Sequence, residues 1–389
     1  MRRLAISLLT ILAGLMLFGA PAGAQSDDTT GDDAASGGTE LAPPVDVLQV
    51  SGLFDPILID EIRSAISRAD DTGAQALVLQ INSNGTVVSD DEIERLLDDV
   101  ADAPIPIGIW VGPNGARFYG PAAQLLAVAD VTGMAPGARV GYTGTPLSPS
   151  TAEIDFTGAA QDALRNGSLG LSEARALQVF TEISDEGVPT ITSMVGILDD
   201  RVVTIGGGDT AAEVTLETTE FVVLDNGQGR NDTTAVVRFS KLGLLDQLFH
   251  TVASPPVAYL LLLTGLALLV FEFYTAGVGV GGVVGAICLI LACTGLAVLP
   301  TRTWAVVAIV AAMLAFAVDV QVGIPRFWTG VGLALTTVAS WFLFENLPGT
   351  TLRPSWITLI AGVGGIALTF IVGMPNMVRT RFATPTIGR

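Results

Sequence analysis

The chain has 389 residues and a formal net charge of −19. A chain this acidic is not drawn to nucleic acid or to anionic lipid by its general field, so we expect no nucleic-acid partner. Half of the residues are hydrophobic, and most of them lie in a short N-terminal run and in a long region after Pro256. This distribution predicts a membrane protein with a separate domain outside the bilayer.

Residues 1–24 have the pattern of a secretory signal peptide. Two arginines precede the apolar run LAISLLTILAGLMLFGA, and the small residues Ala-Gly-Ala follow as a cleavage-site pattern. An uncleaved membrane anchor is the alternative. Residues 25–44 are mostly acidic or small and cannot bury enough apolar surface to fold, so we expect a disordered acidic linker. The signal predicts that the domain after it is exported.

Residues 45–240 alternate between strand patterns and helix patterns. VDVLQVSG is followed by a helix pattern, AQALVLQIN by SDDEIERLLDDV with Ser89 as a candidate N-cap, and IPIGIWV by a helix at about 116–128. Such alternation predicts an α/β domain with a largely parallel sheet. Ligands bind at the carboxyl ends of such strands. Two of these ends have turn-forming sequences, Asn82-Ser83-Asn84-Gly85 and Pro113-Asn114-Gly115.

The segment 241–254 predicts an amphipathic helix at the membrane interface, with Leu242, Leu245, Phe249 and Val252 on one face. It leads into a membrane domain, 255–375, and a short tail, 376–389. Each apolar span of the membrane domain is near the roughly 20 residues that a bilayer requires. Five spans are expected, at about 256–274, 278–299, 304–322, 327–344 and 356–374.

An odd number of spans after an exported domain places the C-terminus in the cytoplasm. The arginines that follow the last span agree with this orientation. Glu272, Asp319 and Glu345 lie near span ends. Ionisable groups in a membrane suggest a transport role, but no broken-helix repeat accompanies them, and interfacial positions are the alternative interpretation.

The order of INSNG, IPIGIWVGPNGAR and AVADVTGMAPGARVGYTGTP resembles the ClpP/crotonase-type serine protease domain of the NfeD family of membrane proteins. The segment 255–292 resembles the first two membrane spans of that family. The resemblance covers 45–389, with a weak stretch at 145–240. It implies a ClpP/crotonase-like exported α/β domain, followed by an all-α membrane bundle of five transmembrane helices in the cell membrane.

The residues that would carry the chemistry of the family are different here. Gly120 stands where the family has its serine, and Asn84-Gly85-Thr86 stands where it has a Pro-Gly-Gly oxyanion turn. The family's base is a lysine some tens of residues after the serine, but the one lysine here is Lys241 and the one histidine is His250. A nucleophilic serine needs a neighbour that accepts its proton. These residues predict a degenerate site without catalytic residues.

We expect His250 to belong to a membrane-surface connector rather than to act as a base in the fold. A carboxylate pair stays open as another arrangement, because acidic residues are abundant. Both cysteines, Cys288 and Cys293, fall within an apolar span, so the exported domain has no disulfide. One histidine and no exported cysteine also make an ordinary zinc site unexpected, and no cofactor is expected.

Two functions follow from these patterns. In the first, the protein is a pseudoenzyme whose exported domain binds partners. The resemblance implies partners of the stomatin or flotillin type, besides the lipid bilayer, and homo-oligomers are expected. In the second, it is a membrane-bound serine peptidase with an atypical catalytic arrangement. A longer member of the family has a cytoplasmic OB-fold barrel after its last span. The tail VRTRFATPTIGR resembles the entrance to that barrel, so either partners bind elsewhere or the given chain is incomplete.

Overall fold

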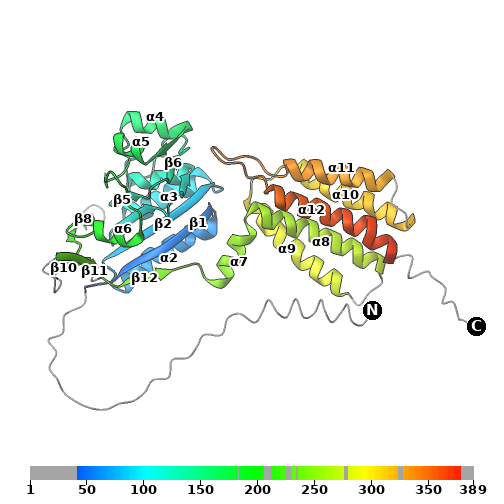
Figure 1. Cartoon of the computed structure of the whole chain (residues 1–389), viewed down its shortest axis with the longest axis horizontal. Helices are drawn as coiled ribbons and strands as arrows, with labels where there is room; N and C mark the ends of the chain where they lie inside the picture. The colour runs from blue at the N-terminus through cyan, green and yellow to red at the C-terminus, as the bar shows by residue number, and fades with distance from the viewer. Residues whose placement is uncertain are drawn as a thin grey trace, which may run out of the picture. The chain divides into compact units, whose positions relative to one another are not determined.

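The computed structural model describes residues 42–182, 184–205, 212–223, 229–233, 235–275, 279–322 and 327–377 (Figure 1). The predicted signal peptide, nearly all of the predicted linker and nearly all of the predicted tail lie outside these residues. The described residues belong to one compact unit. Within it, an α/β domain is followed by a bundle of apolar helices.

The α/β domain contains a main sheet of eight strands among the described residues. All its strand pairs are parallel except β6 with β7, so the predicted, largely parallel sheet is confirmed. Because β12 pairs with β1, the sheet extends to Ser240. The strands are β1 (Val45–Phe54), β2 (Ala76–Thr86), β3 (Ile107–Val111), β4 (Arg117–Tyr119), β5 (Val131–Met134), β6 (Arg139–Gly141), β7 (Ser168–Gly170) and β12 (Val237–Ser240).

Helices α2 (Pro56–Asp71) and α3 (Asp90–Ala101) form where the sequence predicts them. Asp55 caps α2, because its Oδ1 accepts a hydrogen bond from the Leu58 N–H at 2.8 Å. Ser89 precedes α3 as expected, but its side chain makes no capping hydrogen bond. The apolar stripes of both helices are buried in the domain core: Leu58, Ile59, Ile62, Ala65, Ile66 and Ala69 in α2, and Ile93, Leu96, Leu97 and Val100 in α3.

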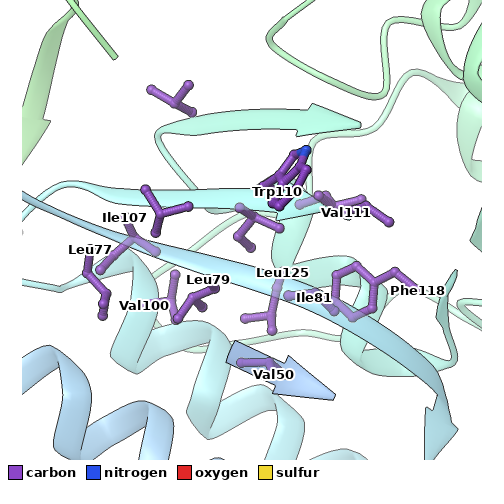
Figure 2. Close-up of a cluster of buried hydrophobic side chains, with 14 of the residues drawn as sticks. Val50, Leu77, Leu79, Ile81, Val100, Ile107, Trp110, Val111, Phe118 and Leu125 are labelled. Carbon is purple, nitrogen blue, oxygen red and sulfur yellow. The ribbon is translucent and has the colours of Figure 1, made fainter. Parts of the chain in front are cut away.

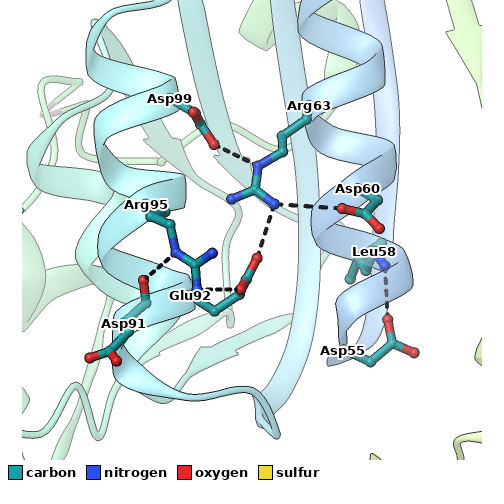
Figure 3. Close-up of polar contacts among 8 residues, drawn as sticks. All are labelled: Asp55, Leu58, Asp60, Arg63, Asp91, Glu92, Arg95 and Asp99. Carbon is teal, nitrogen blue, oxygen red and sulfur yellow. Dashed lines mark hydrogen bonds and ion pairs between the residues drawn. The ribbon is translucent and has the colours of Figure 1, made fainter.

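On their outer sides the two helices are joined by ion pairs (Figure 3). Arg63 of α2 donates to Asp99 at 2.6 Å and to Glu92 at 3.0 Å, both on α3. Arg63 is partly exposed, so water screens these pairs and their contribution to stability is small. Their effect is to fix how α2 lies beside α3.

The core of the domain surrounds the central strands (Figure 2). All five residues of β3 are buried, and in the first six residues of β2 only Gln80 is not fully buried. Such continuous burial is typical of a parallel sheet covered on both faces. Trp110 completes this core and donates its indole N–H to the Val188 carbonyl at 2.8 Å. The side chains that Figure 2 labels come from strands, from α3 and from the segment after β4.

Two local predictions were wrong. Asn82–Gly85 was expected to form a turn, but β2 continues through it to Thr86. The helix expected at about 116–128 is instead a short strand, β4, followed by a 3-10 helix, η1 (Pro121–Ala127). Strand pairing explains the difference. Residues 117–119, at the start of the expected helix, pair with β2 and β6 and therefore form a strand.

The rest of the α/β domain consists of small elements. They are α4 (Gly158–Asn166), α5 (Leu171–Ala176), α6 (Ile191–Ile197), and two antiparallel hairpins, β8 (Val202–Ile205) with β9 (Ala212–Thr215) and β10 (Thr219–Val223) with β11 (Gly229–Thr233).

A bundle of apolar helices follows the connector α7 (Leu244–Val252). Four helices are long and apolar enough to cross a membrane, while α11, the fourth of the five expected spans, has only 16 residues. The bundle contains α8 (Pro255–Thr275), α9 (Val280–Val298), α10 (Thr303–Val322), α11 (Phe327–Phe342) and α12 (Trp356–Leu368), which continues into a π-helical turn, Thr369–Gly373.

The acidic residues near the span ends bind the backbone of the next element. Glu272 accepts from the Gly279 N–H at 2.9 Å, and Asp319 accepts from the Thr329 N–H at 2.7 Å. Gly279 and Thr329 lie at the starts of α9 and α11, where N–H groups have no partner within the helix. Each carboxylate therefore accepts a hydrogen bond at the start of the next helix. Glu345 lies 4.0 Å from Arg302 in an ion pair.

Candidate functional site

The predicted site residues meet at the carboxyl ends of three parallel strands. Ser83 of β2 is paired with Phe118 of β4, and Tyr119 of β4 is paired with Gly141 of β6. This register brings Gly120, directly after β4, beside Gly85 and Thr86 at the end of β2. Asn84, the fourth of the predicted positions, is exposed at the same end of β2. The structure therefore brings the positions singled out in the sequence together.

Gly120 has a backbone that only glycine adopts readily. Its φ is 94° and its ψ is 179°, a region in which other residues are strained. The space for a side chain is also taken. A Cβ at this position would lie 2.9 Å from Thr86 Oγ1 and 3.1 Å from the Thr86 backbone nitrogen. A serine here would have to move one of these groups.

Thr86 fills the corner of the site beside Gly120. Its side chain is almost fully buried, and its hydroxyl oxygen accepts a long hydrogen bond, 3.4 Å, from the Ala122 N–H in the first turn of η1. The residue between them, Pro121, has no N–H. An oxyanion site needs free N–H donors that converge on one point. Around Gly120, the first donor of η1 is directed at Thr86 instead.

Other backbone N–H groups near Gly120 also have partners. The Gly120 N–H donates to the Gly141 carbonyl at 3.1 Å, and the Val87 N–H donates to the Phe54 carbonyl at 2.9 Å. The Gly85 N–H donates to Ser83 Oγ at 3.4 Å. Strand pairing and local turns thus use these donors within the fold.

The cation nearest the site in sequence is Arg117, and it cannot act as a base. Its guanidinium lies 5.9 Å from the centre of the Tyr119 ring, and an arginine stays protonated in proteins. Partial burial raises the pKa of Asp130, while a hydrogen bond from the Ile107 N–H opposes this shift. Ile107 begins β3, so Asp130 lies at the amino end of the sheet, away from Gly120. This carboxylate serves the fold.

A loop between α11 and α12 adds residues to the site that no sequence pattern predicted. Leu347 packs on Gly85, where a Cβ would lie 2.8 Å from Leu347 Cδ1. Gly349 contacts the ring of Tyr142, which in turn stacks edge-on against Tyr119 with the ring centres 5.1 Å apart. A cavity of about 530 Å³ remains beside these contacts, lined by Asn84, Arg117, Asn346, Leu347, Gly349, Thr350 and Thr351.

The loop is held by its own backbone. The Thr350 N–H donates to the Leu347 carbonyl at 3.0 Å, and the Glu345 N–H donates to the Pro300 carbonyl at 2.8 Å. Phe344 also forms a β-bridge with Thr301. Backbone hydrogen bonds therefore hold the part of the loop that contains Leu347.

His250 does contact the α/β domain, which corrects the expectation that it serves only a surface connector. Nδ1 lies 2.7 Å from Asp55 Oδ2, and Nε2 lies 2.8 Å from the Ser51 carbonyl oxygen. Both nitrogens thus face β1 and the start of α2 rather than Gly120. Among the residues that the structure describes, no group of three or more His, Cys, Asp and Glu side chains is arranged to hold a metal ion.

Comparisons with known proteins agree with this architecture. The family model of the NfeD integral membrane domain matches residues 256–374, and an α/β domain precedes this region. Over 353 residues the chain is 25% identical to the membrane-bound protease PH1510 of Pyrococcus horikoshii, covering 86% of this chain and 77% of the relative. It is homologous to that protease.

Two solved structures show the range of structural likeness. One is the 1510-N membrane protease specific for a stomatin homolog from Pyrococcus horikoshii, with a TM-score of 0.41 and 16% identity, covering 54% of this chain and 98% of that chain. The other is an enoyl-CoA hydratase from Shewanella pealeana, with a TM-score of 0.26 and 17% identity, covering 34% and 60%.

Proposed function

We propose that this NfeD-type membrane protein has a catalytically inactive, protease-like domain that binds a membrane protein of the stomatin or flotillin type. The observation that carries the proposal is the state of position 120. It is a glycine whose side-chain space is filled by Thr86, in a backbone region that disfavours serine. Position 120 therefore offers no nucleophile to a bound chain.

The lack of a base supports the same conclusion. The 240 residues before Lys241 contain neither lysine nor histidine. The one histidine has Asp55 and the Ser51 carbonyl at its two nitrogens. Leu347 also covers the end of β2, so a peptide would have to displace the loop to reach Gly85.

The class of partner comes from the relative. The solved 1510-N membrane protease from Pyrococcus horikoshii is specific for a stomatin homolog. For this chain we propose recognition without cleavage, by an exported domain whose helices continue across the membrane to a cytoplasmic C-terminus. Homo-oligomers are part of the proposal, because they would multiply weak contacts with a membrane scaffold.

We also propose that α7 lies along the membrane surface. Leu244 is 88% exposed and Leu245 is 70% exposed, and Leu248 and Phe249 are exposed as well. Two residues separate the end of α7 from α8, the first candidate membrane span. An amphipathic helix in this place buries its apolar face at the headgroup boundary.

The second candidate function, an atypical serine peptidase, has one observation in its favour. A histidine paired with an aspartate lines a cavity of about 440 Å³, which also contains the hydroxyl residues Ser254, Thr350 and Thr351. A base oriented by a carboxylate is the usual way to activate a serine.

A fluorophosphonate probe separates the two functions. Purified full-length protein in detergent should show no labelled serine, and His250→Gln should behave like the natural protein. Labelling of one serine in the natural protein that disappears in His250→Gln would establish the peptidase and refute the inactive domain. An active serine hydrolase treated in parallel verifies the probe.

Binding is tested by crosslinking in native membranes, followed by mass spectrometry. We expect an intact stomatin-type or flotillin-type protein to be crosslinked. Recovery of that protein in cleaved form would contradict the proposal. Failure to crosslink it would also contradict the proposal, provided that the same sample yields the crosslinks of an unrelated membrane complex.

A further inference from the structure

The one histidine of the chain joins the connector helix to the α/β domain. His250 lies on α7, while its partners Asp55 and Ser51 lie about 195 residues earlier, at the start of α2 and in β1. The Nδ1 to Asp55 Oδ2 distance is 2.7 Å, and the Nε2 to Ser51 oxygen distance is 2.8 Å. Both are ordinary lengths for hydrogen bonds that involve an imidazole.

Only the protonated form of His250 satisfies this geometry. A carboxylate and a backbone carbonyl are both acceptors, so each ring nitrogen needs a hydrogen to bond its partner. Neutral imidazole has a hydrogen on one nitrogen and a lone pair on the other. Loss of the proton would therefore leave a lone pair facing either Asp55 or the Ser51 carbonyl, and one of the two hydrogen bonds would break.

The partners of His250 are held in place independently of it. Asp55 is 1% exposed, and its other oxygen caps α2 through the Leu58 N–H. Gly52 leaves the space that the imidazole occupies, since a Cβ there would lie 2.7 Å from His250 Nε2. The φ of Gly52 is +98°, which also favours glycine. The α/β domain thus has a preformed binding position for the imidazole ring.

The electrostatic surroundings of His250 favour its charged form. The hydrogen bond with Asp55 raises the pKa of His250, burial lowers it to a smaller extent, and the Asp55 charge and the Ser51 carbonyl raise it further. Two other charged groups lie near the same region. Arg353 lines the adjoining cavity, but its guanidinium lies over the Trp341 ring at 3.9 Å. Asp246 is one turn earlier on α7, where its carboxylate approaches Gly243.

We propose that His250 and Asp55 form a pH-sensitive latch, which holds the α/β domain on the connector helix while the imidazole is protonated and releases it after deprotonation. The proposal does not depend on whether the domain cleaves peptides. It assigns the exported domain two arrangements, one in which the His250 contact holds it on the connector helix and one in which that contact is open.

The direction of the pH effect follows from the raised pKa. A group whose pKa is higher in the docked state stabilises docking fully below its ordinary value, near 6.5 for histidine. That contribution is lost as the pH rises through the higher, docked value. The latch is therefore closed in acidic surroundings and opens toward alkaline pH.

Titration by NMR tests the protonation directly, because a chain with one histidine gives one imidazole signal. The sample is the full-length protein in nanodiscs, with ¹³C-labelled histidine and no histidine tag. We expect the midpoint to lie above that of free histidine and to fall in Asp55→Asn. Asparagine is a good N-cap, so this variant keeps the helix start and removes only the charge. A midpoint at or below the free value would overturn the proposal.

A distance measurement tests the docking itself. Spin labels at Ser64→Cys on α2 and Gln247→Cys on α7, with both native cysteines replaced by alanine, report how the two helices lie. We expect one narrow distance distribution at acidic pH and a broad one above the histidine midpoint. Gly52→Ala should be broad at every pH, because the added methyl group meets the imidazole.

His250→Gln is the control for the origin of the pH effect. Its distance distribution should not change with pH in the range where the histidine of the natural protein titrates. A distribution in the natural protein that stays narrow through that titration would show that the latch does not open. A pH-dependent change that persists in His250→Gln would assign the effect to another group and also refute the latch.

Discussion

Replacing Gly120 by alanine tests whether the candidate site is filled as the structure indicates. A residue other than glycine in this backbone region costs about 1–3 kcal/mol. The added Cβ would also lie 2.9 Å from Thr86 Oγ1, and forcing such a contact in a packed core costs a further ~1–3 kcal/mol. Each kcal/mol lowers the melting temperature of a domain of this size by about 2–4 °C. Calorimetry of the full-length protein in detergent measures the combined loss as a lower melting temperature.

Gly115→Ala is the matched control for that measurement. Gly115 also has a positive φ, +79°, but a Cβ there would meet nothing within 4 Å. We expect Gly120→Ala to destabilise the domain clearly more than Gly115→Ala. Thr86→Ala should then recover part of the loss in the Gly120→Ala background, with a coupling of about 0.5–3 kcal/mol. Equal effects of the two glycine substitutions, or strict additivity with Thr86→Ala, would refute the crowded site. Gly120→Ser should be destabilised similarly and give no peptidase activity.

Three further predictions concern the loop, the domain and the topology. Leu347→Asp should speed amide hydrogen exchange at the end of β2, because a charged side chain will not stay packed on Gly85. Asn346→Asp, at an exposed loop position, should leave that exchange unchanged. Equal exchange rates in the two variants would show that Leu347 does not cover the end of β2. Residues 42–242 should fold when expressed alone, since β12 completes the sheet beside β1, and an unfolded circular dichroism spectrum at room temperature would contradict this. A reporter after Arg389 should be cytoplasmic; activity outside would mean that α11 does not cross the membrane.

The regular part of the fold could be predicted because its residues repeat with the period of each element. Ile62, Ile66 and Ala69 lie at helical spacing, and all three are buried in α2. The apolar run before Asn82, which only Gln80 interrupts, likewise becomes the largely buried first half of β2. In these segments the local pattern and the tertiary burial demand the same structure, so the sequence contains enough information.

The details of the site depended on contacts that no local pattern records. The helix expected after Ala116 begins instead with β4, because Phe118 and Tyr119 pair with β2 and β6. Asn84, Gly85, Thr86 and Gly120 were chosen by resemblance, and the sheet register then placed them together. Their lack of catalytic function stays a prediction for the probe experiment.

The missing contacts were those between segments far apart in the chain. His250 binds Asp55 across 195 residues, and Leu347 reaches Gly85 from a loop between two membrane helices. Hydrophobic periodicity reports on local structure and does not predict contacts between residues so far apart in the chain. A leucine in a short loop and a histidine beside a span are compatible with many structures. Only the folded chain shows which partners they have.

The three contacts at this end of the sheet share one physical feature. In each, the position that faces the incoming side chain is a glycine: Gly120 faces Thr86, Gly85 faces Leu347, and Gly52 faces His250. A Cβ at any of these glycines would lie within 3 Å of the side chain that faces it, so the contact is possible only because glycine has no side chain. Restoring a serine at Gly120 would therefore disturb packing before it restored chemistry. Peptidase activity would require at least a new nucleophile, a new base and a smaller residue in place of Thr86, together with displacement of the loop that carries Leu347.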